Sequence, residues 1–225
     1  MTSIVIHLRP AYRAIDAEPS GEDSIIDLEQ LAIPADALRE YEKATDDSRN
    51  GKIERAISRL LRALKQAPRY YDAHRLLADQ YRRSGEHLRA EAEFRRAAEI
   101  LPKKAEPFVH LGGMLITDGK YLEAIDVLKA ASERDPKSGV AAFCLGFALY
   151  KTNQLDEAGL FLDKAQGLDP QIPDTHLILA KVFLRRHDDV HALEQLDTYI
   201  EKSSDPGQRT AAGKIRDRIR ARMLN

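Results

Sequence analysis

The sequence predicts an all-α protein made of helical hairpins that repeat every 34 residues. Prolines recur at this interval, at Pro68, Pro102, Pro136 and Pro170. Seventeen residues before each proline stands a turn residue, at Gly51, Gly85, Gly119 and Asn153. Glycine and asparagine adopt the positive φ that ends many helices, and proline blocks a helix from continuing. Each unit is therefore expected to be a helix, a turn, a second helix and a stop.

Small residues at fixed places in the repeat predict how the two helices pack. In the first helix they are Ala44, Ala78, Gly112, Gly146 and Ala180, and in the second they are Ala56, Ala90, Ala124, Ala158 and Ala192. Two antiparallel helices approach closely only when the side chains at their crossing are small and larger neighbours fill the grooves. Leucines next to the first set, such as Leu77 and Leu145, are expected to be those neighbours.

This pattern resembles the tetratricopeptide repeat. The stretch GKYLEAIDVLKAASERDP (residues 119–136) matches that family almost position by position. The resemblance implies a right-handed α-solenoid of helix-turn-helix repeats that serves as a non-catalytic protein-interaction scaffold or adaptor. Its five repeats would span residues 37–70, 71–104, 105–138, 139–172 and 173–204, within a domain that covers residues 34–204. Pentatricopeptide repeats, which read RNA, are usually one residue longer and fit less well.

Both ends of the repeat array depart from the family pattern. Glu40 and Asp47 stand where large apolar residues are usual, as expected if the outer face of the first repeat meets solvent. Tyr199 replaces an alanine and Ser204 replaces the closing proline, which indicates a last repeat with a different neighbour.

Residues 205–225 are expected to form a capping helix. Ala211, Ile215, Ile219 and Met223 are spaced by four residues and form one apolar stripe. The remaining surface is mostly basic, which suits a polar cap on the last apolar face of a solenoid. The alternative is that this positive charge contacts phosphate or acidic lipid.

Residues 1–33 form a separate acidic leader. It begins with the strand-like run SIVIHLRP (residues 3–10) and continues through AEPSGEDS (residues 17–24), which has the composition of a linker. Three interpretations remain open. The run resembles the end of a carboxypeptidase-regulatory-like domain found before repeat arrays in exported bacterial proteins. The leader could instead occupy the chain's own groove, or be disordered.

Composition excludes several classes of function. The formal net charge is −1, which does not favour nucleic acid, and no apolar run is long enough to span a membrane. We expect a cytoplasmic protein if the chain is complete, and a periplasmic or cell-surface one if it is the tail of an exported protein.

No catalytic, cofactor or metal site is expected. The sequence contains no phosphate-binding glycine loop, and Cys144, the sole cysteine, lies in an apolar stretch typical of a structural residue. His187 and His191 in HDDVH are spaced for a shared metal, but no third ligand is evident. A metal-dependent enzyme that uses these two histidines is the remaining catalytic alternative.

A partner protein or peptide is expected in the groove that, by resemblance, the first helix of each repeat lines. The first two repeats offer arginines to orient acidic groups, namely Arg75, Arg82 and Arg83. The later repeats offer mostly apolar and aromatic side chains with two cations, namely Val109, Val140, Phe143, Phe147, Tyr150, Leu177, Ile178, Lys181 and Arg185. The helix GVAAFCLGFALY (residues 139–150) is apolar on every side, so either core packing or a ligand must cover it.

Two further expectations concern the kind of partner. Chaperone-binding members of the family clamp a terminal carboxylate with lysines and asparagines, but here the clamp positions carry Tyr41, Thr45, Arg75 and Asp79. The tails of Hsp70 and Hsp90 are therefore not expected ligands. A self-assembling structural protein is the alternative to an adaptor.

Overall fold

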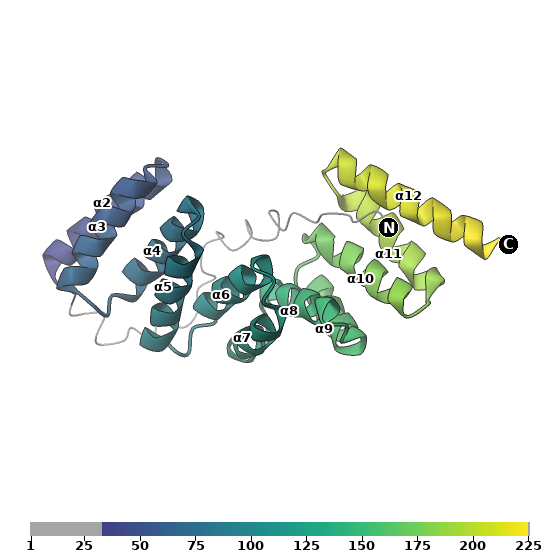
Figure 1. The fold of residues 1–225 in the computed structure, drawn as a ribbon, viewed down its shortest axis with the longest axis horizontal. Coiled ribbons are helices and arrows are strands. Elements are labelled where there is room, and N and C mark those ends of the chain that lie inside the picture. Colours follow the sequence, from purple (N-terminus) through teal and green to yellow (C-terminus); the bar gives the residue numbers. More distant parts are fainter. Residues whose placement is uncertain (1–32, 225) are drawn as a thin grey trace. The chain divides into compact units, whose positions relative to one another are not determined.

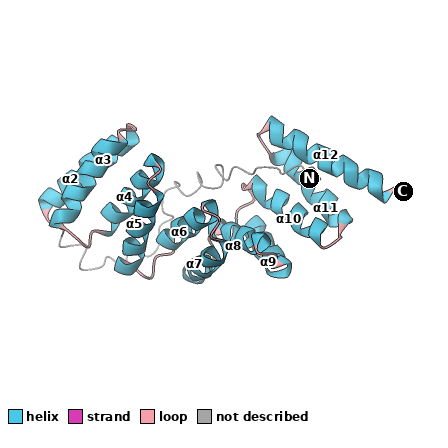
Figure 2. Cartoon of the chain, in the orientation of Figure 1, coloured by secondary structure: helices cyan, strands magenta, loops and turns pink. Residues whose placement is uncertain are grey.

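A computed structural model describes residues 33–224 of the chain. Over this range every element is an α-helix (Figure 1, Figure 2). The strand-like run SIVIHLRP and the rest of the leader lie outside the described residues. The helices are α2 (Ala35–Arg49), α3 (Ile53–Gln66), α4 (Tyr71–Ser84), α5 (His87–Ile100), α6 (Glu106–Thr117), α7 (Tyr121–Arg134), α8 (Gly139–Lys151), α9 (Leu155–Leu168), α10 (Pro173–Arg185), α11 (Asp189–Lys202) and α12 (Pro206–Met223).

The described residues divide into two compact units. We call residues 33–114 the N-terminal unit and residues 115–224 the C-terminal unit. Helices α2 and α3 pack together in the first unit, as do α4 and α5, and in the second unit α8 packs on α9 and α10 on α11. These four pairs of helices form helical hairpins.

The turns within the hairpins have the backbone conformation that the sequence predicts. The φ angles are +71° at Gly51, +83° at Gly85, +76° at Gly119 and +64° at Asn153. The left-handed prediction for these four residues is confirmed. His187 adopts the same conformation, with φ of +61°, at the equivalent place 34 residues after Asn153.

The small residues lie at buried helix crossings, as predicted. Gly146 of α8 is an example, because a Cβ atom at this position would lie 2.7 Å from Cγ of Leu162 on α9. Leu162 is itself fully buried. Helices α8 and α9 can approach this closely only because Gly146 has no side chain.

The first hairpin differs from expectation, because Glu40 and Asp47 do not face solvent. Asp47 is buried and accepts a 2.8 Å hydrogen bond from Nε of Arg59 on α3. Glu40 lies 3.8 Å from Nη1 of the same arginine, and its side chain is largely covered. The expectation of a solvated outer face here was wrong, since the arginine compensates both carboxylates inside the hairpin.

Glu40 belongs to a polar contact that recurs between the two helices of a hairpin. Residues 19 apart in sequence form it: Glu40 with Arg59, His74 with Glu93 at 2.6 Å, and His176 with Gln195 at 2.8 Å. His74, Glu93 and His176 are buried. Polar pairs therefore replace apolar packing at this place in three of the hairpins.

The C-terminal cap is built on Tyr199. This side chain is fully buried in a cluster with Leu177, Leu196, Ala212 and Ile219, and its hydroxyl group donates a hydrogen bond to Gln208 of α12. Tyr199 therefore fastens α12 to the last hairpin, whereas the other repeats carry an alanine.

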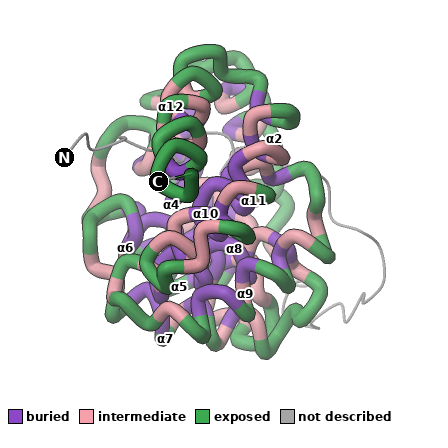
Figure 3. The backbone as a smooth tube through the Cα atoms, turned by 90° about the vertical axis from the view of Figure 1, so that its right-hand side faces the viewer, coloured by how far each residue is buried: buried purple, intermediate pink, exposed green. Residues whose placement is uncertain are grey.

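Helix α12 uses a face slightly different from the predicted stripe. Ala212 and Ile219 are buried and Ile215 packs beside them, whereas Ala211 is only partly covered and Met223 is 49% exposed. The predicted stripe was therefore wrong at Ala211 and at Met223. Most of α12 faces solvent (Figure 3).

Several arginines of α12 are neutralised by acids of α11. Arg216 and Arg220 both contact Asp197, at 3.3 and 2.9 Å, and Arg222 pairs with Asp189. These ion pairs support the cap interpretation of the basic surface, because part of its charge is used within the unit.

Candidate functional site

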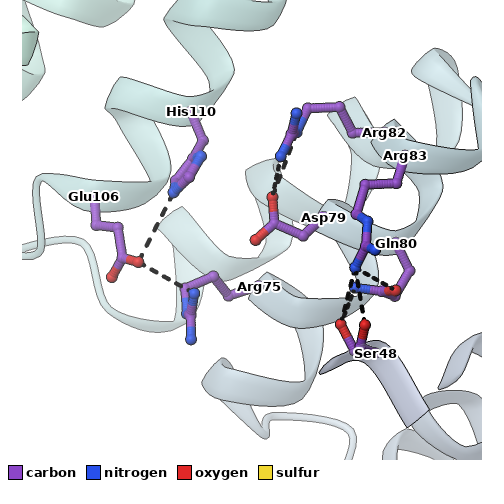
Figure 4. Close-up of polar contacts among 8 residues, drawn as sticks. All are labelled: Ser48, Arg75, Asp79, Gln80, Arg82, Arg83, Glu106 and His110. Atoms are coloured by element: carbon purple, nitrogen blue, oxygen red, sulfur yellow. Dashed lines mark hydrogen bonds and ion pairs between the residues drawn. The ribbon is translucent and has the colours of Figure 1, made fainter. Parts of the chain in front are cut away.

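The predicted site arginines of the N-terminal unit all have partners within that unit (Figure 4). Nη1 of Arg75 lies 3.3 Å from Oε1 of Glu106. Arg82 pairs with Asp79 at 3.1 Å. Arg83 donates to the backbone oxygen of Ser48 at 3.2 Å. Arg75 and Arg82 are therefore paired with carboxylates on α6 and α4, and Arg83 has an uncharged hydrogen-bond acceptor on α2.

Glu106 stays ionised at the centre of this polar cluster. Burial alone would raise its pKa, but His110, whose Nε2 lies 3.8 Å from Oε1, and the positive charge of Arg75 outweigh burial, so the pKa falls to about 2. The hydroxyl of Tyr71 also donates to Glu106, at 3.3 Å. The Arg75–Glu106 pair is therefore charged on both sides at neutral pH, and neither member needs a ligand for compensation.

The most apolar of the predicted contacts are buried. On α8 and α10, Phe143 and Leu177 are each 1% exposed and Ile178 is fully covered. Leu177 belongs to the cluster around Tyr199, so it contributes to the core of the C-terminal unit. Val109 of the N-terminal unit is buried too. These side chains could contact a ligand only if their neighbours moved.

Three further predicted residues, Tyr150, Lys181 and Arg185, meet with Lys151 on one surface of the C-terminal unit, which we call the cationic face. It consists of Tyr150 and Lys151 at the end of α8, with Lys181 and Arg185 on α10, and it adjoins Phe147, which is only 6% exposed. The Arg185 guanidinium stacks 4.2 Å from the Tyr150 ring centroid, and Nζ of Lys151 lies 6.0 Å from the Phe147 centroid. Two cations therefore lie over aromatic rings at this place, and Lys181 is a third cation nearby.

Arg185 is fixed on the cationic face by the backbone of α8. Its Nη1 donates to the carbonyl oxygen of Tyr150 at 3.0 Å. Arg83 makes the equivalent bond to Ser48 in the N-terminal unit, and both bonds join residues 35 apart. The last carbonyls of a helix lack intrahelical donors, so an arginine from the next hairpin satisfies one of them.

Lys181 is the partly covered cation of the cationic face, whereas Lys151 and Arg185 are exposed. Burial, followed by the positive charge of Lys151, lowers its pKa to about 8, and Arg185 acts in the same direction. Asp174 opposes this shift, but that carboxyl group is buried and its own pKa is raised by burial. Within residues 33–224 no hydrogen bond or ion pair holds the Lys181 ammonium group.

Cys144 and the two histidines of HDDVH have structural surroundings. Cys144 is buried on α8, and burial raises the pKa of its thiol to about 12. Asp188 caps α11 by accepting from the backbone N–H of His191 at 3.1 Å and contacts Nδ1 of the same residue at 2.6 Å. His187 is the left-handed turn residue. Over the described range, no group of three or more histidine, cysteine or carboxylate side chains is placed to hold a metal.

Comparison with known proteins identifies the family. Two sequence profiles match, both described as tetratricopeptide repeat, one over residues 34–105 and the other over residues 115–182. The chain belongs to the tetratricopeptide repeat family. The all-α solenoid fold class that the resemblance implied is confirmed by the all-helical structure and by similar solved structures. This family and fold support a general role as a protein-interaction scaffold.

One curated protein is similar in sequence to this tetratricopeptide repeat protein. Anaphase-promoting complex subunit 3 of Schizosaccharomyces pombe is 27% identical over 155 residues, which is 68% of this chain. The chain spans only 23% of the length of that relative.

Solved structures share the fold at low sequence identity. MamA from Desulfovibrio magneticus RS-1 is 22% identical with a TM-score of 0.70, over 76% of this chain and 96% of that one. YrrB, described as a TPR protein with an unusual peptide-binding site, is 22% identical with a TM-score of 0.69, over 91% of this chain and 98% of that one.

Over residues 33–224, none of the helices combines the length and apolar character that a bilayer crossing requires.

Proposed function

We propose that this tetratricopeptide repeat protein is a non-catalytic scaffold that binds a peptide segment of a partner protein on the cationic face of its C-terminal unit. The observation that carries the proposal is the unpaired Lys181, which lies near two other cations and the partly covered ring of Tyr150. Arg75 and Arg82 of the N-terminal unit, by contrast, already have carboxylate partners.

The side chains of the cationic face have the properties of binding contacts. Aromatic rings and arginine typically dominate the energetics of protein interfaces. Tyr150 and Arg185 are held together by stacking and by a backbone hydrogen bond, so little side-chain entropy is lost when a ligand covers them. Val140 lies partly covered near the start of α8 and could extend the contact. Phe143, Leu177 and Ile178 would support the face from within the unit.

YrrB provides a precedent for this kind of function. It is described as having an unusual peptide-binding site. Its fold similarity to this chain makes peptide binding a reasonable function to test, and the residues to test come from the cationic face.

The test is a peptide selection on the full chain. A library of random dodecapeptides displayed on phage would be selected against the immobilised protein, and the enriched peptides would be synthesised and measured by fluorescence anisotropy. Tyr150→Ala is expected to weaken their binding by roughly tenfold or more, because a central aromatic contact is lost.

Leu160→Ala is the matched control. Leu160 is a large side chain on α9, 67% exposed, outside the cationic face. Its truncation should leave peptide binding unchanged. Selected peptides that bind Tyr150→Ala as tightly as the parent chain would contradict the proposed site, as would a selection that enriches no binding sequence.

A further inference from the structure

The cationic face also indicates what chemistry its ligand carries. Lys151, Lys181 and Arg185 bring three positive charges to one place, and within residues 33–224 no ion pair joins any of them to an acid. Elsewhere in the protein, partly covered cations such as Arg59 and Arg75 have carboxylate partners. Lys181 is thus a partly covered cation that lacks such a partner.

We propose that the cationic face takes an acidic peptide segment of a partner protein, with a carboxylate of that segment paired to the ammonium of Lys181. This inference rests on the proposed function, because it names the ligand chemistry of the same surface. Taking an ammonium group out of water without a counter-ion is unfavourable, and an acidic ligand removes that cost.

The arrangement suits one or two carboxylates beside an apolar side chain. Lys181 and Arg185 are four residues apart on α10, so both point to the same side of that helix. The partly covered ring of Tyr150 supplies apolar surface next to them. The hydrogen bonds from Arg185 to Tyr150 and Asn153 leave part of its guanidinium group open to a ligand.

The electrostatics of the whole chain favour a short acidic segment over a long polyanion. The formal net charge is −1, so no general positive field attracts nucleic acid. The three cations are a local cluster beside the buried carboxyl group of Asp174, which limits how much negative charge the site can hold. A segment with one or two correctly placed acids fits this charge balance.

Binding should depend on pH in a defined direction. The groups that act on Lys181 are Lys151, Arg185 and Asp174. A carboxylate ligand favours the charged ammonium and raises the pKa of Lys181 from about 8. Affinity should therefore be greatest below pH 8 and should fall as the pH rises above it. At the higher pH Lys181 is neutral, so its amine must take up a proton before the carboxylate can pair with it.

The test uses the full chain and peptides of known charge. Fluorescein-labelled decaglutamate would be titrated with protein at about 0.15 M salt, where long-range attraction is screened. Decaglutamine is the uncharged comparison, and a ten-residue oligothymidine is the non-peptide polyanion. We expect decaglutamate to bind more tightly than both.

Substitution of the lysine decides whether the ammonium is the recognition group. Lys181→Met keeps the length of the side chain and removes its charge, and is expected to weaken decaglutamate binding about tenfold or more. Lys164→Met, at an exposed position on α9, is the matched control and should have no effect. Circular dichroism of both variants checks that helicity is retained.

The other outcomes overturn the proposal. Equal affinity for oligothymidine would show only general attraction of anions. If Lys164→Met weakened decaglutamate binding as much as Lys181→Met does, this too would show only general attraction of anions. Absence of decaglutamate binding to the full chain would also overturn the proposal. This applies even if the reason were that acidic residues of the chain itself, between residues 16 and 29, occupy the cationic face.

The two proposals fail in different ways. If selected peptides depend on Tyr150 but are uncharged and insensitive to Lys181→Met, the proposed function stands and the acidic ligand is wrong. If no peptide depends on Tyr150, the surface itself is wrong.

Discussion

Replacing Tyr199 with alanine is expected to lower the free energy of unfolding of the C-terminal unit by about 3–5 kcal/mol, the usual cost of deleting a buried aromatic side chain. The ring is fully buried between α11 and α12, and its loss leaves a cavity beside Leu177 and Ile219. It also removes the hydrogen bond to Gln208 that holds α12. Urea denaturation followed by circular dichroism measures the change.

Tyr199→Phe separates the ring from its hydroxyl group. This variant keeps the packing and loses only the hydrogen bond, so the expected cost is about 1 kcal/mol. Hydrogen exchange should show α12 opening more readily in Tyr199→Ala than in Tyr199→Phe. A loss under about 1 kcal/mol for Tyr199→Ala would mean that α12 is not fastened by this residue.

Gly146→Val is expected to destabilise the C-terminal unit by about 3 kcal/mol, at the upper end of the range for overpacked cores. A Cβ atom at Gly146 would lie 2.7 Å from Cγ and 3.1 Å from the backbone nitrogen of Leu162. The side chain of Leu162 can adjust, but the backbone of α9 cannot move without separating the two helices. Thermal unfolding of the full chain would reveal the loss.

Gly167→Ala is the contrasting variant on the partner helix. No atom lies within 4 Å of a Cβ at that position. Alanine also favours helix over glycine, so the expected result is a gain of about 0.5 kcal/mol near this helix end. If both variants destabilised the chain equally, close packing at Gly146 would not explain its glycine.

The turns and crossings were predictable because local rules determine them. The residue types of Gly51 and Asn153 alone indicate a left-handed backbone, and the 34-residue interval places these residues in equivalent turns. His187 shows where this signal weakens, since histidine adopts the conformation far less often than glycine. Only its place in the repeat would have indicated the turn.

Contacts between helices were harder to predict because they depend on residues distant in sequence. Glu40 and Asp47 looked like solvent-exposed acids, but Arg59 on the next helix neutralises both. Arg75 looked like a ligand contact, but Glu106 pairs with it. A charged residue in a repeat helix can be a binding group or one half of an internal pair, and the sequence alone does not distinguish the two.

In the apolar helix α8, the sequence alone likewise does not distinguish core residues from surface residues. Its sequence predicted either core or a covered groove, and in the structure Phe143 is buried whereas Tyr150 is only partly covered. Leu177 was predicted as a contact because its position in the repeat faces a groove in the family, yet it packs against Tyr199 and the cap. A residue that differs from the repeat pattern, such as Tyr199, changed the role of its neighbour.

The central claim is that Lys181 is an uncompensated ammonium group that an acidic segment pairs with, and competitive acetylation of the full chain tests it most directly. Limiting acetic anhydride would be applied between pH 6 and pH 10, and mass spectrometry would measure labelling at each lysine, with and without decaglutamate. Without peptide, labelling of Lys181 should titrate with a pKa of about 8. With peptide, that titration should move to higher pH and the labelling should decrease, while Lys164 stays unchanged. Titration of Lys181 in the ordinary range of lysine, with no response to peptide, would contradict the account.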